Sequence, residues 1–221
     1  MNRSHTPGAL APGTYRITAN IFVPAANNDI LHLTAYMTNP RNPLVPVDDP
    51  NYGIPTSPVA DNATLVVTSD GARTLVVPLP NPAFTLIGFG ELTPGLTVLG
   101  AERDGKTYGT HTQGRLTKVA FKLDGTSKAY MLNRSSVYAA PLKLDKTWDL
   151  ILAVEYDSAV KISDNTTVDV PVGPVVPGPV APVPTDPAPA PAPVTPRPQG
   201  PSVSGKLARR QIGRASCRER V

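Results

Sequence analysis

The stretch Ala63-Thr-Leu-Val-Val-Thr68, joined through Ser69-Asp-Gly-Ala72 to Arg73-Thr-Leu-Val-Val-Pro78, decides the fold class. Both flanks are rich in β-branched residues, which favour strands. The Asp70-Gly71 pair between them is a turn signal, because a tight hairpin turn needs residues that tolerate a positive φ. The stretch therefore predicts an antiparallel β-hairpin.

Segments that alternate apolar and polar residues continue on both sides of this hairpin, and helix-period stripes are missing. We predict further strands at 14–22, 30–36, 83–89, 114–123, 126–132 and 148–156. In the last of these, alternate residues from Trp148 to Tyr156 share one apolar face, and Ile151 and Ala153 on the other face indicate a central strand. Short strands separated by turn signals predict an all-β chain, an immunoglobulin-like antiparallel β-sandwich.

The prolines define the domain organisation. Of 27 prolines, 13 lie between Pro171 and Pro201. We expect a disordered N-terminal segment at 1–12, one folded domain at 13–160, a disordered Pro/Ala/Val-rich segment at 161–205 and a basic tail at 206–221. The proline-rich segment is interpreted either as a stalk that spans a cell wall or as a linker inside a larger soluble protein.

The charge lies at the C-terminus. The formal net charge is +4, but residues 206–221 carry +5, so the remainder sums to −1. The folded part has no basic face, and we expect no nucleic-acid partner. Residues 212–221 resemble an in-frame translation of a sequencing adapter. They are therefore set aside together with Cys217, the chain's one cysteine, which leaves no disulfide or thiol chemistry.

No catalytic or metal-binding motif is found in the sequence. His5, His32 and His111 lack metal-ligand spacing, and the acidic pairs do not match a calcium loop. His111 is expected to be solvated. No nucleophile elbow or phosphate-binding loop occurs, so we predict a non-enzymatic protein. No apolar run is long enough to span a bilayer, which predicts no membrane insertion within this fragment.

Three segments resemble the NEAT domain, the haem-binding immunoglobulin-like module of Gram-positive surface proteins. Gly13-Thr-Tyr-Arg-Ile17 is similar to its first strand, the segment from Ser57 to Pro78 to its lip and second hairpin, and the segment from Pro141 to Leu150 to its final hairpin. The resemblance spans 13–157 and implies a monomeric, extracellular module on a bacterial cell surface. The signal peptide and the anchor of such a protein are not present in this fragment.

The resemblance also implies where a ligand would bind, in a groove between the segment 56–60 and the strand 144–148. Haem-binding members carry two tyrosines four residues apart, where this chain has Leu144 and Trp148. Leu144 cannot ligate iron, whereas Trp148 offers a flat ring for stacking. A substitute iron ligand would have to come from a residue such as Met131, Tyr138 or Tyr130. The candidate ligand-binding residues are Trp148, Leu144, Thr56, Ser57 and Tyr138.

Two functions follow from this interpretation. In the first, the domain is a cell-surface binding module for haem or a haem protein. In the second, it is a structural or adhesive module that binds host or neighbouring proteins and no haem. Trp148 lines the groove in the first case, and a core position for its side chain is the alternative.

Overall fold

The computed structural model describes residues 10–40 and 54–171, and these residues form β-structure. The elements are β1 (Gly13–Val23), β2 (Ala35–Tyr36), β3 (Ala63–Val67), β4 (Arg73–Pro78), β5 (Phe84–Gly88), β6 (Glu91–Leu92), β7 (Leu96–Arg103), β8 (Leu116–Leu123), β9 (Ala129–Ala139), the 3-10 turn η1 (Ala140–Leu142) and β10 (Leu144–Ser163). Within these two ranges there is no α-helix, and hence no helix with the length and apolarity to cross a membrane. The predictions for 1–9 and 172–221 lie outside the described residues.

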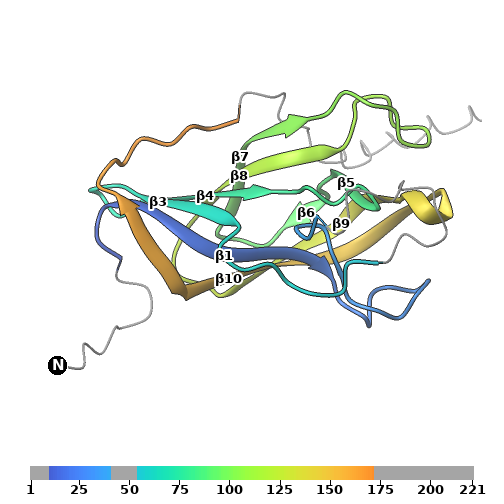
Figure 1. Cartoon of the computed structure of the whole chain (residues 1–221), viewed down its shortest axis with the longest axis horizontal. Coiled ribbons are helices and arrows are strands. Elements are labelled where there is room, and N and C mark those ends of the chain that lie inside the picture. Colours follow the sequence, from blue (N-terminus) through green and yellow to red (C-terminus); the bar gives the residue numbers. More distant parts are fainter. Residues whose placement is uncertain (1–9, 41–53, 172–221) are drawn as a thin grey trace, which may run out of the picture. The chain divides into compact units, whose positions relative to one another are not determined.

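All the strand pairs are antiparallel, and the strands join in one sheet with the order β5-β9-β10-β1-β3-β4-β8-β7. The short strands β2 and β6 add to β1 and β9. The sheet curls so that its two ends approach each other (Figure 1). The predicted all-β antiparallel class is therefore confirmed, and the observed form is a single curled sheet.

The predicted hairpin at 63–78 is confirmed. β3 pairs with β4 from Thr64 opposite Val76 to Val67 opposite Arg73, and Gly71 has a φ of +84° in the turn. The central position predicted for the last strand is also confirmed, because β10 pairs with β1 on one side and β9 on the other.

Two local predictions differ from the structure. Residues 30–36 were expected to form a strand, but only Ala35–Tyr36 does so. The Asn28 side chain accepts hydrogen bonds from the backbone N–H groups of Ile30 and Leu31, which folds this segment into a turn and leaves His32 at a φ of +51°. β7 was not predicted, and its alternation is interrupted by a register shift between Val98 and Gly100.

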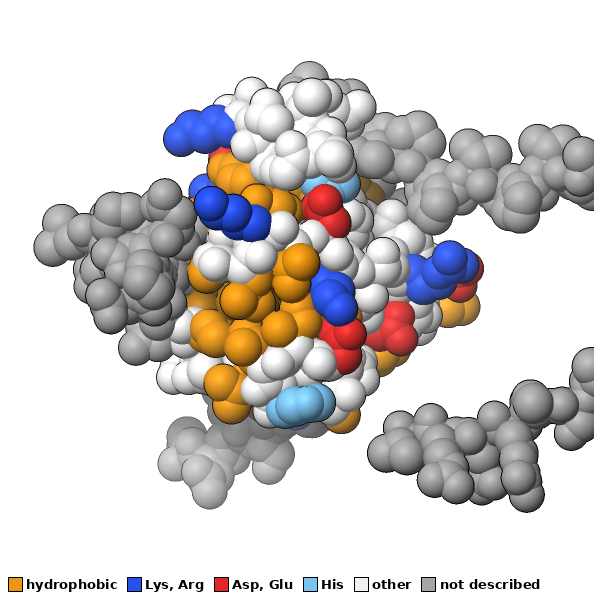
Figure 2. All heavy atoms as spheres, turned by 90° about the vertical axis from the view of Figure 1, so that its right-hand side faces the viewer, with side chains coloured by type: hydrophobic (Ala, Val, Ile, Leu, Met, Phe, Trp, Pro, Cys, Tyr) orange, Lys and Arg blue, Asp and Glu red, His pale blue; other side chains and the backbone are white. Residues whose placement is uncertain are grey.

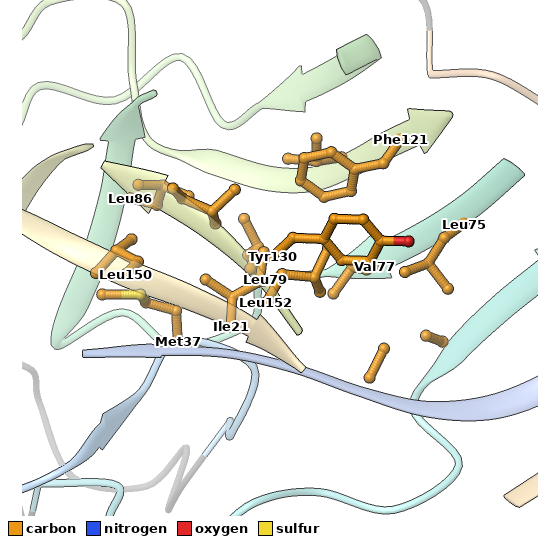
Figure 3. Close-up of a cluster of buried hydrophobic side chains, with 14 of the residues drawn as sticks. Ile21, Met37, Leu75, Val77, Leu79, Leu86, Phe121, Tyr130, Leu150 and Leu152 are labelled. Carbon is orange, nitrogen blue, oxygen red and sulfur yellow. The ribbon is translucent and has the colours of Figure 1, made fainter. Parts of the chain in front are cut away.

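The core fills the inside of the curl. Figure 3 shows side chains from β1, β4, β8, β9 and β10 meeting there, with Phe121 and Leu152 among the fully buried ones. The hydroxyls of Tyr130 and Tyr156 are buried and have no hydrogen-bond partner among the described residues. Burial, followed by the neighbouring Tyr130, raises the pKa of Tyr156 well above that of an exposed tyrosine. Both tyrosines are therefore core residues.

The two ends of the sheet meet without a backbone ladder. The Phe89 ring, just after β5, packs edge-on against Phe121 of β8 at a centroid distance of 5.6 Å. Arg103, the last residue of β7, donates from Nη2 to the Ile87 carbonyl of β5 at 2.7 Å. Side chains thus close the seam between β5 and the β7–β8 pair. This seam positions the candidate site.

Candidate functional site

Residues 104–115, here called the arm, extend the β7–β8 hairpin beyond the sheet. At the base of the arm, the Asp104 N–H donates to the Arg115 carbonyl at 3.3 Å. At its tip, Tyr108 and His111 exchange two backbone hydrogen bonds of 3.0 and 2.9 Å. Gly109 in this tip has a φ of +56°, which glycine adopts without strain. The arm is therefore an ordered second hairpin.

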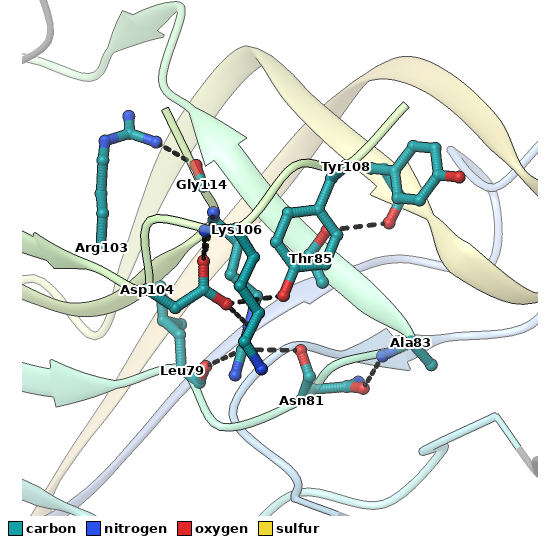
Figure 4. Close-up of polar contacts among 11 residues, drawn as sticks. Leu79, Asn81, Ala83, Thr85, Arg103, Asp104, Lys106, Tyr108 and Gly114 are labelled. Carbon is teal, nitrogen blue, oxygen red and sulfur yellow. Dashed lines mark hydrogen bonds and ion pairs between the residues drawn. The ribbon is translucent and has the colours of Figure 1, made fainter. Parts of the chain in front are cut away.

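Asp104 organises the base of the arm (Figure 4). Its carboxylate accepts hydrogen bonds from the Tyr108 hydroxyl at 2.6 Å, from Arg115 Nε at 3.1 Å and from the backbone N–H of Lys106 at 3.1 Å. Arg115 also donates to the carbonyls of Leu79 and Asn81, which ties the arm to the end of β4. Burial acts to raise the pKa of Asp104, but these hydrogen bonds and the charge of Arg115 outweigh it and lower the pKa below its ordinary value.

The tip of the arm rests on β9 and β10. His111 Nε2 lies 2.7 Å from Asp145 Oδ1, and the Tyr108 ring packs edge-on against Tyr138 at 6.1 Å. A Cβ at Gly109 would lie 2.9 Å from the Tyr138 ring, so the backbone there touches the ring directly. His111 was expected to be solvated. Its side chain is instead 27% exposed, because Asp145 holds it against the sheet.

A pocket of about 540 Å³ lies between the arm and the sheet. Its walls are residues 87–89 at the end of β5, residues 110–113 of the arm, Arg103, Arg134 and Ser136 of β9, and Thr147 of β10. Ile87 and Phe89 supply apolar surface, and hydroxyl, amide and guanidinium groups supply most of the rest. Mixed walls of this kind on a preformed scaffold are typical of small-molecule sites.

Arg134 reaches this pocket because of a β-bulge. Trp148 pairs with Ser135 and Leu150 pairs with Leu132, so two residues of β9 oppose the single residue Asp149. Arg134 adopts a φ of +51° at the bulge, a conformation that strains a non-glycine residue by about 1–3 kcal/mol. Bulges re-aim side chains and are frequent at functional sites.

The strained turn is held by its neighbours. The Arg134 N–H donates to Asp149 Oδ1 at 2.8 Å. A Cβ at Gly90 would lie 2.5 Å from the carbonyl oxygens of Asn133 and Arg134, so the turn packs directly on that glycine. Among residues 10–40 and 54–171, no acidic side chain pairs with the Arg134 guanidinium. Arg134 is thus an exposed arginine at the pocket wall with no ion pair among the described residues.

The structure places the sequence-predicted site residues apart from this pocket. Trp148 is 4% exposed, stacks on Phe84 at 6.2 Å and donates from Nε1 to Asp29 at 2.8 Å, as a core residue does. Leu144 is exposed near η1. Thr56 and Ser57 are exposed, and the Ser57 carbonyl accepts from Asn39. Tyr138 is half-buried beneath the tip of the arm.

Several of the residues predicted for a haem site are packed within the fold. Leu144 has no ligand atom, and Trp148 is already stacked within the core. Of the substitute ligands, Tyr130 is 2% exposed among apolar side chains, Met131 is half-buried, and Tyr138 packs against Tyr108. In the described part of the chain, no cluster of three or more His, Cys, Asp or Glu side chains is arranged to hold a metal ion.

The pocket residues were missed because they come from five segments that are separate in the sequence: the end of β5, the end of β7, the arm, β9 and β10. Two sequence signals were present: the polar segment between Gly109 and Gly114, and the Asn133-Arg-Ser135 interruption within an alternating strand. Comparison with known proteins finds no matching family model, no similar curated protein and no similar solved structure. The pocket itself therefore carries the functional argument.

Proposed function

We propose that this chain is a non-enzymatic binding module of a bacterial cell-surface protein and that its ligand binds in the pocket under the arm. The observation that carries the proposal is the bulge at Arg134, which places an exposed arginine without an ion pair, in a strained backbone conformation, at the wall of the pocket. The cell-surface part of the proposal rests on the family resemblance of 13–157. We also propose that the curled sheet is a form of the immunoglobulin-like sandwich, in which the two ends of one sheet supply the two layers.

The environment of His111 supports binding rather than catalysis. His111 and Asp145 resemble two members of a catalytic triad, and Ser136 and Thr147 lie in the same pocket. A nucleophile must hydrogen-bond the histidine that activates it. No hydroxyl of the described residues hydrogen-bonds His111. The histidine and the aspartate instead fasten the arm to β10.

The proposal is tested by ligand-observed NMR on the full chain, with mixtures of sugars, carboxylic acids and amines. Thr147→Trp fills the pocket from an exposed position on β10, and Thr97→Trp is the matched control at an exposed threonine of β7. We expect binders whose signal is lost in Thr147→Trp and kept in Thr97→Trp. If no compound binds, or if the binders respond equally to both substitutions, the pocket is not the binding site.

Hemin is examined separately by absorption spectroscopy. A Soret shift that is lost in Thr147→Trp assigns haem to this pocket and makes His111 the ligand to substitute next. A shift that Thr147→Trp leaves unchanged assigns haem elsewhere on the protein and contradicts the pocket. If hemin produces no shift, haem is excluded as the ligand.

An adhesive module is the second candidate, favoured by apolar side chains on one end of the molecule. Figure 2 shows hydrophobic side chains gathered on the end where η1 and the arm lie. Leu142 and Leu144, on either side of the end of η1, are 39% and 41% exposed. If this surface binds a host protein, Leu142→Ser with Leu144→Ser abolishes adhesion of protein-coated beads to host cells, and Thr147→Trp does not.

A further inference from the structure

We propose that the pocket under the arm recognises a carboxylated sugar, with Arg134 binding the carboxylate. This inference rests on the proposed function, because it names the ligand class of the same pocket. Three features of the wall carry it: an unpaired guanidinium, several groups that both donate and accept hydrogen bonds, and a half-buried aromatic ring.

The guanidinium selects a carboxylate. Arginine presents its N–H donors in a planar fork that matches the two oxygens of a carboxylate, and such bonds are stronger than neutral ones. Neither nearby acid forms an ion pair with the guanidinium, since Asp145 binds His111 and Asp149 accepts from the backbone N–H of Arg134. Arg103 uses Nη1 and Nη2 on the carbonyls of Gly114 and Ile87. Arg134 is therefore the cation available to a ligand.

The neutral polar groups favour a ligand rich in hydroxyls. Thr112, Gln113, Ser136 and Thr147 line the pocket from the arm, β9 and β10. Hydroxyl and amide side chains both donate and accept hydrogen bonds, as sugar hydroxyls do. A bare inorganic anion accepts hydrogen bonds from these groups but offers them no donor, so it leaves their acceptor oxygens unused. The wall is thus better matched to a polyol that carries one acidic group.

The apolar part of the wall favours a ring with a C–H face. Phe89 is half-buried, and its ring is held by the edge-on contact with Phe121. Ile87 lies beside it in the pocket wall and is 8% exposed. An aromatic side chain gives a rigid apolar surface at small entropic cost. The cavity of about 540 Å³ is within the range of small-ligand sites.

The test is calorimetric titration of the full chain with D-galacturonate, D-galactose and acetate as probes. We expect galacturonate to bind about tenfold or more tightly than either galactose or acetate, because it alone engages both the guanidinium and the hydroxyl groups. Arg134→Asn removes the charge while keeping a residue that tolerates positive φ, so folding is preserved. This variant is expected to bind galacturonate no better than galactose, while Arg16→Gln, at an exposed arginine of β1, binds as the wild type does.

The possible results separate the two proposals. Equal binding of galacturonate and galactose, both lost in Thr147→Trp, overturns the ligand class and leaves the pocket as the binding site. Equal binding of acetate and galacturonate overturns the sugar component. If no saccharide binds while other compounds of the NMR mixtures occupy the pocket, the ligand class is wrong. If nothing binds the pocket in either experiment, both proposals fail. Arg134→Lys adds a readout of geometry: retained charge without the planar fork is expected to give intermediate affinity.

Discussion

Replacing Gly109 by alanine is expected to detach the arm while the sheet stays folded. Gly109 has a φ of +56°, a conformation that costs an L-residue about 1–2 kcal/mol. The new Cβ would also lie 2.9 Å from the Tyr138 ring and 3.2 Å from Asp145 Oδ2. The backbone strain and the steric contact both arise at the tip of the arm. Detachment of the tip from β9 and β10 removes the steric contact and lets the backbone at residue 109 leave the positive φ.

The contacts that hold the tip are of similar size to these penalties. The half-exposed pair of His111 and Asp145 contributes at most about 1 kcal/mol, and the ring contact of Tyr108 and Tyr138 about 0.5–1.5 kcal/mol. Strain of about 1–2 kcal/mol together with the steric contact is therefore enough to shift the arm toward the detached state.

Gly71→Ala is the matched control. Gly71 has a φ of +84° but no atom within 4 Å of an added Cβ, so this substitution adds strain without a steric contact. Its cost falls on the β3–β4 hairpin and lowers the melting temperature by about 2–4 °C per kcal/mol. Global stability is followed by the fluorescence of Trp148, the chain's single tryptophan.

The position of the arm is followed through backbone NMR signals of Tyr138, Asp145 and Thr147 in both variants. We expect large shifts at these residues in Gly109→Ala and small ones in Gly71→Ala, with ligand binding lost only in the first. Wild-type signals in Gly109→Ala would show that the arm does not depend on the close approach of residue 109 to β9.

Three further predictions concern the sheet and its ends. Hydrogen bonds from Lys146 and Trp148 of β10 lower the pKa of Asp29, so its carboxylate stabilises the fold above pH 3.8, and this contribution is lost as the pH falls through the lower native pKa. Melting curves should therefore show the wild type more stable than Asp29→Asn near pH 7, with the difference in stability closing below pH 3.8. A difference that stays constant with pH contradicts the assignment. Leu152→Ala is expected to lower the free energy of unfolding in urea by about 2–5 kcal/mol, because Leu152 is fully buried. Ile162→Ala on the same strand, where the side chain is 57% exposed, is expected to change it by no more than about 0.5 kcal/mol. Equal losses in the two variants would refute this account of the core. Gly100→Val would bring a Cβ to 2.2 Å from the Pro171 carbonyl and is expected to release the segment at 168–171 from β7, seen as faster proteolysis there without a matching loss of fluorescence-detected stability.

The features predicted correctly depend on neighbouring residues. The 63–78 hairpin is specified by alternation on both sides of an Asp-Gly pair, so its pairing and register follow from local geometry. The central position of β10 was likewise visible in the apolar residues on both of its faces.

The failures have equally specific causes. At 30–36, the Asn28 side chain competes for backbone N–H groups and turns a strand-like composition into a turn. In β7, residue 100 must be glycine because Val170 and Pro171 pack closely against it. This long-range contact places a glycine within the strand, and the glycine interrupts the alternating pattern that would have predicted it. For the site, Arg103 of β7 reaches Ile87 of β5 only because the sheet curls, and no local sequence pattern predicts that curl.

The pocket follows from the way the curl ends. A sheet that closes fully satisfies its edges with a backbone ladder, but here the seam between β5 and β7 is bridged by the Arg103 side chain. No backbone ladder joins β5 to β7. The arm begins at the end of β7, beside this seam, and its tip contacts Tyr138 of β9 and Asp145 of β10. The core lies on the opposite face of the same strands, since Ser136 and Thr147 point toward the pocket and Val137 and Trp148 point inward. Substitutions in the arm therefore change the pocket wall without altering a buried core side chain. In the proposed binding module, this separation would allow the ligand to vary on a constant sheet.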